Sequence, residues 1–171
     1  VGITAAHAAS LDRQQAVSAM KRAATFYREK VACRGGYVYY YSPDLRGRLA
    51  EGPATPTQIC VQPPATPTVG MAYLKAYAAT GDNYYLEAAR ETAESLVYGQ
   101  LKSGGWTQKI DFNPRSKEAQ QYRNGKGNNR GKNNSTLDDG QSQSAMLFMI
   151  RCDEALGFKH KAIHESASVA A

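Results

Sequence analysis

Two adjacent carboxylates, Asp138 and Asp139, are the clearest candidates for chemistry in the sequence. They follow the polar run 133–136 and precede an apolar helical pattern, so they stand where a loop becomes a helix. Oxygen donors of this kind are the ligands that Ca²⁺ prefers, and two neighbouring carboxylates could also serve as an acid and a base. A purely structural role is the alternative, because negative charge stabilises a helix N-terminus.

A basic polar loop over residues 115–135 precedes the two aspartates. Six basic residues and one acid lie between Arg115 and Asn134, so this window carries +5 of the formal net charge of +6. Proteins that bind phosphates usually spread their charge over a face and interleave it with aromatic residues, whereas only Tyr122 interrupts this run. We therefore expect an acidic polysaccharide as the partner rather than nucleic acid. A solvated loop that binds nothing is the alternative.

Individual side chains near these two features are candidates for binding a sugar polymer. Trp106 and Tyr40 offer flat faces on which sugar rings could stack, although either ring could instead pack in the core. The candidate partners for substrate carboxylates are Lys109, Arg123 and Lys132. No residue is assigned as a catalytic base.

Histidine and cysteine give weaker signals. His160 and His164 stand four residues apart on an expected helix and could share a metal ion, but no third ligand accompanies them. The three cysteines include no C-x-x-C pair, which argues against a disulfide framework and a cysteine-type zinc site and leaves one bridge possible. No P-loop, nucleophile elbow or dinucleotide-binding glycine pattern is present, so the common α/β enzyme classes are excluded.

Five helices are expected to position these residues. Apolar spacing, capping residues and glycine stops predict helices over about 13–31, 66–80, 83–101, 138–156 and 160–171. In the first helix, Val17, Met20, Ala24, Tyr27 and Val31 are expected to face inward. Residues 37–41 are rich in Tyr and Val and predict a short extended segment. Prolines in the twice-occurring unit Pro-Ala-Thr-Pro-Thr predict an extended loop from residue 53 to 67.

An internal repeat suggests how the helices are arranged. Residues 19–37 align with residues 88–106, and each copy is an amphipathic helix that ends in Gly-Gly-aromatic. Helical hairpin repeats with such turns predict an all-α fold, an α/α toroid with the aromatic residues at one rim. Five helices form only an incomplete ring, so we expect residues 11–171 to be a partial toroid from the N-terminal portion of a longer protein.

The first ten residues are expected to lie outside this domain. Ala6-His7-Ala8 fits the small-x-small pattern of a signal-peptidase site, so residues 1–10 are either a signal-peptide remnant or a disordered tail. No stretch approaches the ~20 apolar residues that span a bilayer. We therefore expect a secreted or periplasmic protein without a membrane partner.

Two blocks of the sequence resemble known families. Residues 100–106 (Gln-Leu-Lys-Ser-Gly-Gly-Trp) fit the Q-x-x-x-G-x-W repeat of squalene-cyclase-like toroids, but the D-x-D-D acid of those cyclases is missing. Gly104-Gly105-Trp106, followed by Thr136-Leu137-Asp138-Asp139-Gly140-Gln141-Ser142 and Met146-Leu147-Phe148-Met149, resembles the α/α-toroid pectate lyases, polysaccharide lyase family ten. The similarity extends from about Gln15 to Gly157.

The second resemblance implies a bacterial protein that acts on or binds polygalacturonate. It implies that Asp138 helps to bind Ca²⁺ and the uronate carboxylate. Asp139, in the place of the family's Asn, is then expected to be a second ligand or a residue that orients the first. The implied chemistry is Ca²⁺-dependent β-elimination. No arginine here matches the family's base, so this chain is expected to lack the catalytic arginine. The alternatives are a non-catalytic glycan-binding or protein-interaction module and, third, a terpenoid-cyclase-like toroid.

Overall fold

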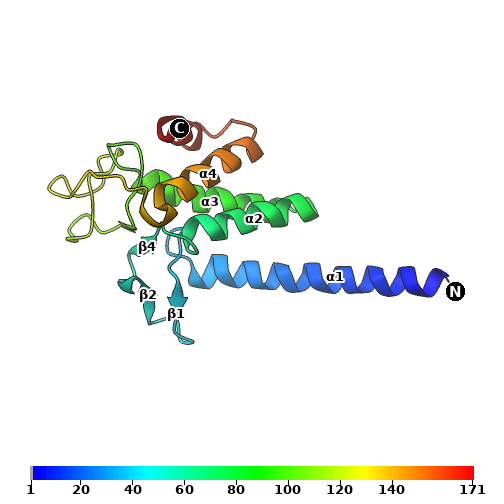
Figure 1. Cartoon of the computed structure of the whole chain (residues 1–171). Helices are drawn as coiled ribbons and strands as arrows, with labels where there is room; N and C mark the ends of the chain where they lie inside the picture. The colour runs from blue at the N-terminus through cyan, green and yellow to red at the C-terminus, as the bar shows by residue number, and fades with distance from the viewer. Residues whose placement is uncertain (1) are drawn as a thin grey trace. The chain divides into compact units, whose positions relative to one another are not determined.

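The computed structural model describes the backbone of residues 2–171 and the side chains of residues 12–171. The chain forms two units, residues 1–32 and residues 33–171. The first unit is helical, and the second holds four α-helices, a short 3₁₀-helix and two small sheets. Figure 1 labels several of these helices and strands along the chain.

The first unit is one long helix with an irregular end. Helix α1 spans Gly2–Phe26 and continues as a π-helical turn, η1, over Tyr27–Val31. The helix therefore begins earlier than the expected residue 13 and includes residues 2–10, while the signal-peptide interpretation of that segment stays a prediction. Val31 is buried, but Val17 and Tyr27 are exposed, so the expected apolar stripe is wrong at those two positions.

Helices α2 (Thr66–Thr80), α3 (Asn83–Gly99), α4 (Gln141–Ala155) and α5 (Lys161–Ala170) build the second unit. Helix α2 packs against α3 and α4, and α4 also packs against α3 and α5. In Figure 1, α2, α3 and α4 lie side by side, and the loops between α3 and α4 extend from one end of this layer. The expected boundaries of these helices are confirmed to within about three residues.

Local signals explain where these helices begin and end. Pro67 stands in the first turn of α2, where its missing N–H costs no helical hydrogen bond. Gly81 ends that helix with φ 69°, a left-handed conformation that favours glycine. The Asp82 carboxylate then accepts a hydrogen bond from the Tyr84 N–H at 2.9 Å, which caps α3. At α5 the His160 Nδ1 accepts from the Ile163 N–H at 3.4 Å.

Two antiparallel sheets accompany the helices. The first contains β1 (Tyr40–Tyr41), β2 (Arg48–Ala50) and β3 (Gly52–Pro53), with Tyr40 opposite Leu49 and Ala50 opposite Gly52. The second pairs β4 (Gln58–Cys60) with β5 (Lys109–Asp111), with Ile59 opposite Ile110. Both isoleucines are buried, so this sheet joins two distant loops through the core.

The expected all-α toroid is wrong. About half of the residues are helical and 9% are in strands, which makes the fold a mixed one with small antiparallel sheets. β-branched or aromatic residues stand in β1 (Tyr40–Tyr41), in β4 (Ile59) and in β5 (Ile110), and such side chains fit a pleated surface better than a helix. The extended segments expected at 37–41 and 53–67 contain β1 and β4, respectively, and most of their other residues are irregular or turn.

The two Gly-Gly-aromatic turns have the same left-handed glycine conformation, but their aromatic residues do not lie at an exposed rim as expected. Gly35 has φ 83° and Gly104 has φ 98°, so each turn uses a conformation that favours glycine. The aromatic residues that follow, Tyr37 and Trp106, are both buried. These turns therefore send their aromatic side chains into the core.

Two further findings concern the cysteines and the length of the helices. Cys33, Cys60 and Cys152 are free thiols, so the one possible bridge is not formed. Among the described residues, no helix combines the length and the apolar character needed to cross a lipid bilayer.

Candidate functional site

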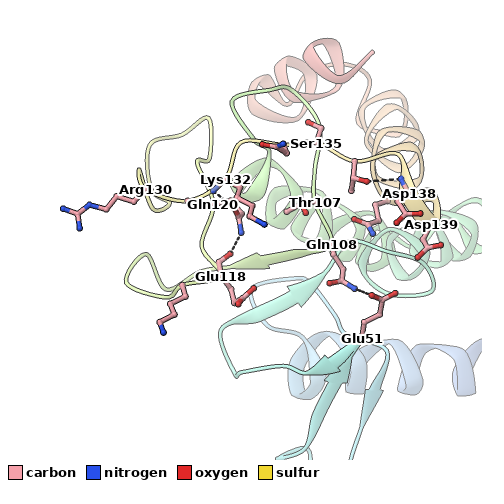
Figure 2. Close-up of a pocket in the computed structure, with 15 residues that line it drawn as sticks. Glu51, Thr107, Gln108, Glu118, Gln120, Arg130, Lys132, Ser135, Asp138 and Asp139 are labelled. Carbon is pink, nitrogen blue, oxygen red and sulfur yellow. Dashed lines mark hydrogen bonds between the residues drawn. The ribbon is translucent and has the colours of Figure 1, made fainter.

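A groove of about 840 Å³ lies between the start of α4 and the polar loop that precedes it. Figure 2 shows its lining, with the aspartates on one side and the polar loop on the other. Charged and uncharged polar residues make up almost all of the lining: the acids are Glu51, Glu118, Asp138 and Asp139, and the bases are Lys117, Arg130 and Lys132. Opposite charges therefore share one open space.

Asp138 and Asp139 lie in a single 3₁₀ turn, η2 (Asp138–Gly140), that leads into α4. The Asp138 N–H donates to the Thr136 hydroxyl at 3.1 Å, and both aspartates are exposed. Asp139 has φ 48° and Gly140 has φ 69°, so two left-handed residues turn the chain into the helix. The carboxylates thus stand beside the positive end of α4, which stabilises their charge.

Hydrogen bonds to the backbone of Trp106 hold this turn in place. The Ser142 hydroxyl accepts from the Trp106 N–H and donates to the Trp106 carbonyl, both at 3.0 Å. The Thr136 N–H donates to the same carbonyl at 2.9 Å. The two blocks that carry the resemblance, around Trp106 and around Asp138, are therefore in direct contact.

Three glutamines and two acids form what we call the carboxamide cluster: Gln62, Gln108, Gln141, Glu51 and Asp139. The Gln62 Nε2 donates to Asp139 Oδ2 at 3.1 Å. The Gln62 Oε1 accepts from Gln141 Nε2 at 3.4 Å and from Gln108 Nε2 at 3.5 Å. Gln108 Nε2 also donates to the Glu51 carboxylate. Gln62 therefore stands at the centre of the cluster.

Beneath this cluster, Tyr39 and Cys60 remain protonated. Burial raises the pKa of the Tyr39 hydroxyl, and the charges of Glu51 and Asp139 raise it further. Burial also raises the pKa of the Cys60 thiol, although the Lys109 ammonium opposes that shift. Neither group supplies an anion to the groove at neutral pH.

The basic side of the groove is formed by the polar loop 115–135, whose backbone is held by hydrogen bonds within the loop. The Lys132 N–H donates to Gln120 Oε1 at 2.8 Å, and its carbonyl accepts from the Gln121 N–H at 3.0 Å. These bonds anchor the backbone of Lys132 while its side chain stays exposed. In Figure 2, Arg130 extends away from the aspartates at the outer end of the loop.

The candidate site residues divide into those that line the groove and those that do not. Asp138, Asp139 and Lys132 line it. Trp106 is fully buried, and its indole Nε1 donates to the Leu96 carbonyl at 2.9 Å, so its faces pack in the core and are closed to a sugar ring. Tyr40 is 67% exposed on β1, outside the groove lining.

The two other basic candidates also lie outside the groove lining. Lys109 is half-buried on β5. Arg123 donates through Nη1 to Gln100 Oε1 at 2.7 Å. Gln100 is itself buried, so Arg123 helps to hold the loop to the end of α3.

The two histidines that could share a metal ion have separate partners. His160 Nε2 lies 3.1 Å from Glu94 Oε1, and His164 Nδ1 lies 2.8 Å from Asp153 Oδ2. Each pair links α5 to a different helix, α3 for His160 and α4 for His164. Within the described side chains no group of three or more His, Cys, Asp or Glu is placed to hold a metal.

Sequence reasoning missed the members of the site that come from distant loops. Glu51 stands between β2 and β3, and Gln108 immediately precedes β5. Gln62 and Gln141 make their contacts across 79 residues of sequence. Nothing around Glu51 marks it as functional, whereas Gln108 and Gln141 lie within two residues of the blocks around Trp106 and Asp139.

The oxygen donors at the groove fit the Ca²⁺ that the sequence resemblance implies. Asp138 and Asp139 supply carboxylates, and the Oε1 of Gln141, in the same lining, is buried without a hydrogen-bond partner. Carboxylates, carboxamide oxygens and water are the ligands that Ca²⁺ takes in proteins. Asp138, Asp139 and Gln141 would hold the ion, and water or a ligand carboxylate would complete its coordination.

Comparison with known proteins adds no relative to this description. No family model, curated protein or solved structure matches the chain.

Proposed function

We propose that this chain binds an acidic polysaccharide, of the polygalacturonate class, in the groove between the 3₁₀ turn and the polar loop. The observation that carries the proposal is the shared lining: two adjacent aspartates face the same open space as Lys117 and Lys132. A uronate polymer presents one carboxylate on each sugar. Lysines can pair with such carboxylates directly, and aspartates can reach them only through a shared cation.

Asp138 and Asp139 would hold that cation, with Gln141 close by. A bound Ca²⁺ supplies positive charge next to the uronate carboxylate and thereby makes the neighbouring C5–H more acidic. The two aspartates orient the polymer by fixing where one of its carboxylates binds. Lys132, anchored through its backbone, pairs with a second carboxylate along the chain.

The more specific proposal is a lyase. In β-elimination a base removes the C5 proton, the electron pair forms the C4–C5 double bond, and the 4-linked sugar leaves with its oxygen. The product carries a double bond conjugated to the carboxylate and absorbs in the ultraviolet. A binding module that lacks this step is the second candidate, and the exposed, basic loop favours it equally well.

The third candidate, a terpenoid cyclase, has no observation in its favour. Such an enzyme needs a deep apolar cavity for its substrate, whereas charged and amide side chains line the groove described here.

One experiment separates these candidates. The protein is mixed with polygalacturonate with and without Ca²⁺, and both bound polymer and ultraviolet absorbance are measured. Absorbing product that needs Ca²⁺ and is lost in Asp138→Asn supports the lyase. Binding without product supports the module, and neither binding nor product contradicts the proposed function. The control is Glu154→Gln, which removes an exposed carboxylate of α4 outside the groove lining.

A further inference from the structure

Gln62 contacts the Asp139 carboxylate from the segment between β4 and α2, more than seventy residues away in sequence. Its Nε2 donates to Asp139 Oδ2 at 3.1 Å, and within the described side chains this is the sole hydrogen bond that the carboxylate accepts. The bond occupies one carboxylate oxygen and leaves Oδ1 for another partner. A carboxylate held in this way has fewer orientations to lose when it binds a cation.

The direction of that hydrogen bond is fixed by its surroundings. A carboxamide has one donating and one accepting end, and the two ends are distinguished by their partners. Gln108 Nε2 and Gln141 Nε2 both approach the Gln62 oxygen, so the Gln62 nitrogen must face Asp139. Gln108 Nε2 also donates to the Glu51 carboxylate, so the nitrogen end of the Gln108 amide is the end that faces Gln62.

The backbone that carries Gln62 is firmly held. Val61, immediately before it, is fully buried, and its N–H donates to the Gln108 carbonyl at 2.7 Å. The Gln62 carbonyl accepts from the Ala65 N–H at 3.1 Å at the start of α2. Gln62 therefore presents its amide from the junction of β4 and α2, whereas Asp139 sits in an exposed turn.

We propose that Gln62 is a positioning residue that orients the Asp139 carboxylate for the cation of the proposed site. This inference rests on the proposed function, because it concerns the Ca²⁺ that Asp138 and Asp139 would share. Gln62 itself does not bind the cation, since its donating end faces Asp139 and its oxygen is already shared by two donors. Loss of such a supporting hydrogen bond typically lowers metal affinity about 10–100-fold.

The test is a calorimetric titration of Ca²⁺ into the wild type, Gln62→Met and Gln108→Met. Gln108→Met is the matched control, because it removes the same group from the same cluster but leaves the Gln62–Asp139 bond, and Gln141 Nε2 still fixes the direction of the Gln62 amide. We expect Gln62→Met to weaken Ca²⁺ binding at least tenfold and Gln108→Met to change it less than threefold. Melting temperatures without Ca²⁺ report the purely structural cost of each substitution.

A second variant and a spectroscopic measurement separate positioning from folding. Gln62→Asn keeps an amide but is one methylene too short to reach Asp139, so it should weaken Ca²⁺ binding as much as Gln62→Met. The infrared carboxylate bands of the wild type should shift on Ca²⁺ addition, and in both Gln62 variants that shift should require higher Ca²⁺.

The possible outcomes distinguish the two proposals. Wild-type affinity in both Gln62 variants overturns the role of Gln62 and leaves the cation site intact. Equal losses in Gln62→Met and Gln108→Met also overturn it, because they indicate a structural role for the whole cluster. Absence of Ca²⁺ binding by the wild type overturns the cation site and the role of Gln62 with it.

Discussion

The Ser142 hydroxyl bonds both the N–H and the carbonyl of Trp106, each at 3.0 Å, and so joins the glycine turn after α3 to the first turn of α4. Ser142 is three residues from Asp139, and Trp106 is two residues from Gln108. One serine therefore couples the aspartate turn to the segment just before β5, which carries Gln108 of the carboxamide cluster. The position of the groove's acidic side depends on this link.

Replacing Ser142 by alanine should destabilise the protein and, by freeing the aspartate turn, weaken Ca²⁺ binding. The Trp106 N–H would be left buried without a partner, at a cost of about 1–3 kcal/mol, while its carbonyl keeps the Thr136 N–H. Urea unfolding measures the change in the free energy of unfolding, and calorimetric titration measures the change in Ca²⁺ affinity. The control is Ser168→Ala, since that exposed hydroxyl donates to the His164 carbonyl of its own helix, away from the aspartate turn. Equal stability of the two variants would contradict the role of Ser142.

Trp106→Phe tests whether this side chain acts in the core or on the ligand. Phenylalanine cannot donate to the Leu96 carbonyl and fills less space, so we expect roughly 2 kcal/mol lower stability. Polygalacturonate affinity, measured at a temperature where both proteins are folded, should change less than threefold. A large loss of affinity with unchanged stability would show that the ring contacts the sugar after all.

Gly70 is a packing constraint between α2 and α4. A Cβ at this position would lie 2.2 Å from the Phe148 ring, and the ring is itself fully buried. Gly70→Ala should cost roughly 1–2 kcal/mol by overpacking, after the better helix propensity of alanine is counted. Thermal unfolding tests this, with Thr68→Ala as an exposed control in the same turn. Adding Phe148→Leu should cost less in the Gly70→Ala background than in the wild type.

Alkaline pH should unfold the protein in part through Cys152. Burial, together with a smaller contribution from the neighbouring Asp153 carboxylate, raises the pKa of this thiol from 9.0 to about 12. Below pH 9 both the folded and the unfolded chain hold the proton. As the pH rises from 9 towards 12 the unfolded chain releases it and the folded chain does not, so stability falls.

Unfolding free energies at several pH values between 8 and 11 give the slope of this loss. Cys152→Ala should have a shallower slope in this window, whatever its cost at pH 8. The tyrosine Tyr122, whose pKa burial raises to about 12, should keep part of the slope in both proteins. Identical slopes would show that Cys152 does not contribute.

The helices were the most predictable part of the fold. The 66–80 helix was located at both ends, because Pro67 marks its start and Gly81 its stop. The sheets were not predictable, because β4 pairs with β5 about fifty residues away and neither strand has a local partner. The same lack of a pairing signal led to the wrong all-α toroid.

The site was partly predictable for a similar reason. Asp138, Asp139 and Lys132 stand out in the sequence through their spacing and charge, and all three line the groove. Trp106 looks the same in sequence whether it packs in the core or stacks on a ligand, and only its burial decides. Glu51 and Gln62 join the site through the sheets, so their roles depend on the strand pairing that the sequence does not reveal.

The central claim is that the groove, rather than the net charge of the chain, binds the acidic polymer. The direct test compares two double charge reversals in the same loop. Lys117→Glu with Lys132→Glu changes the groove lining, whereas Arg115→Glu with Lys126→Glu changes exposed residues outside it by the same total charge. Polygalacturonate binding is measured by calorimetry at one fixed salt concentration, because screening alters both pairs alike.

We predict that the groove pair lowers affinity at least tenfold and that the outer pair lowers it less than threefold. Equal losses in the two variants, or wild-type affinity in the groove pair, would contradict the claim that the polymer binds between the aspartate turn and Lys132.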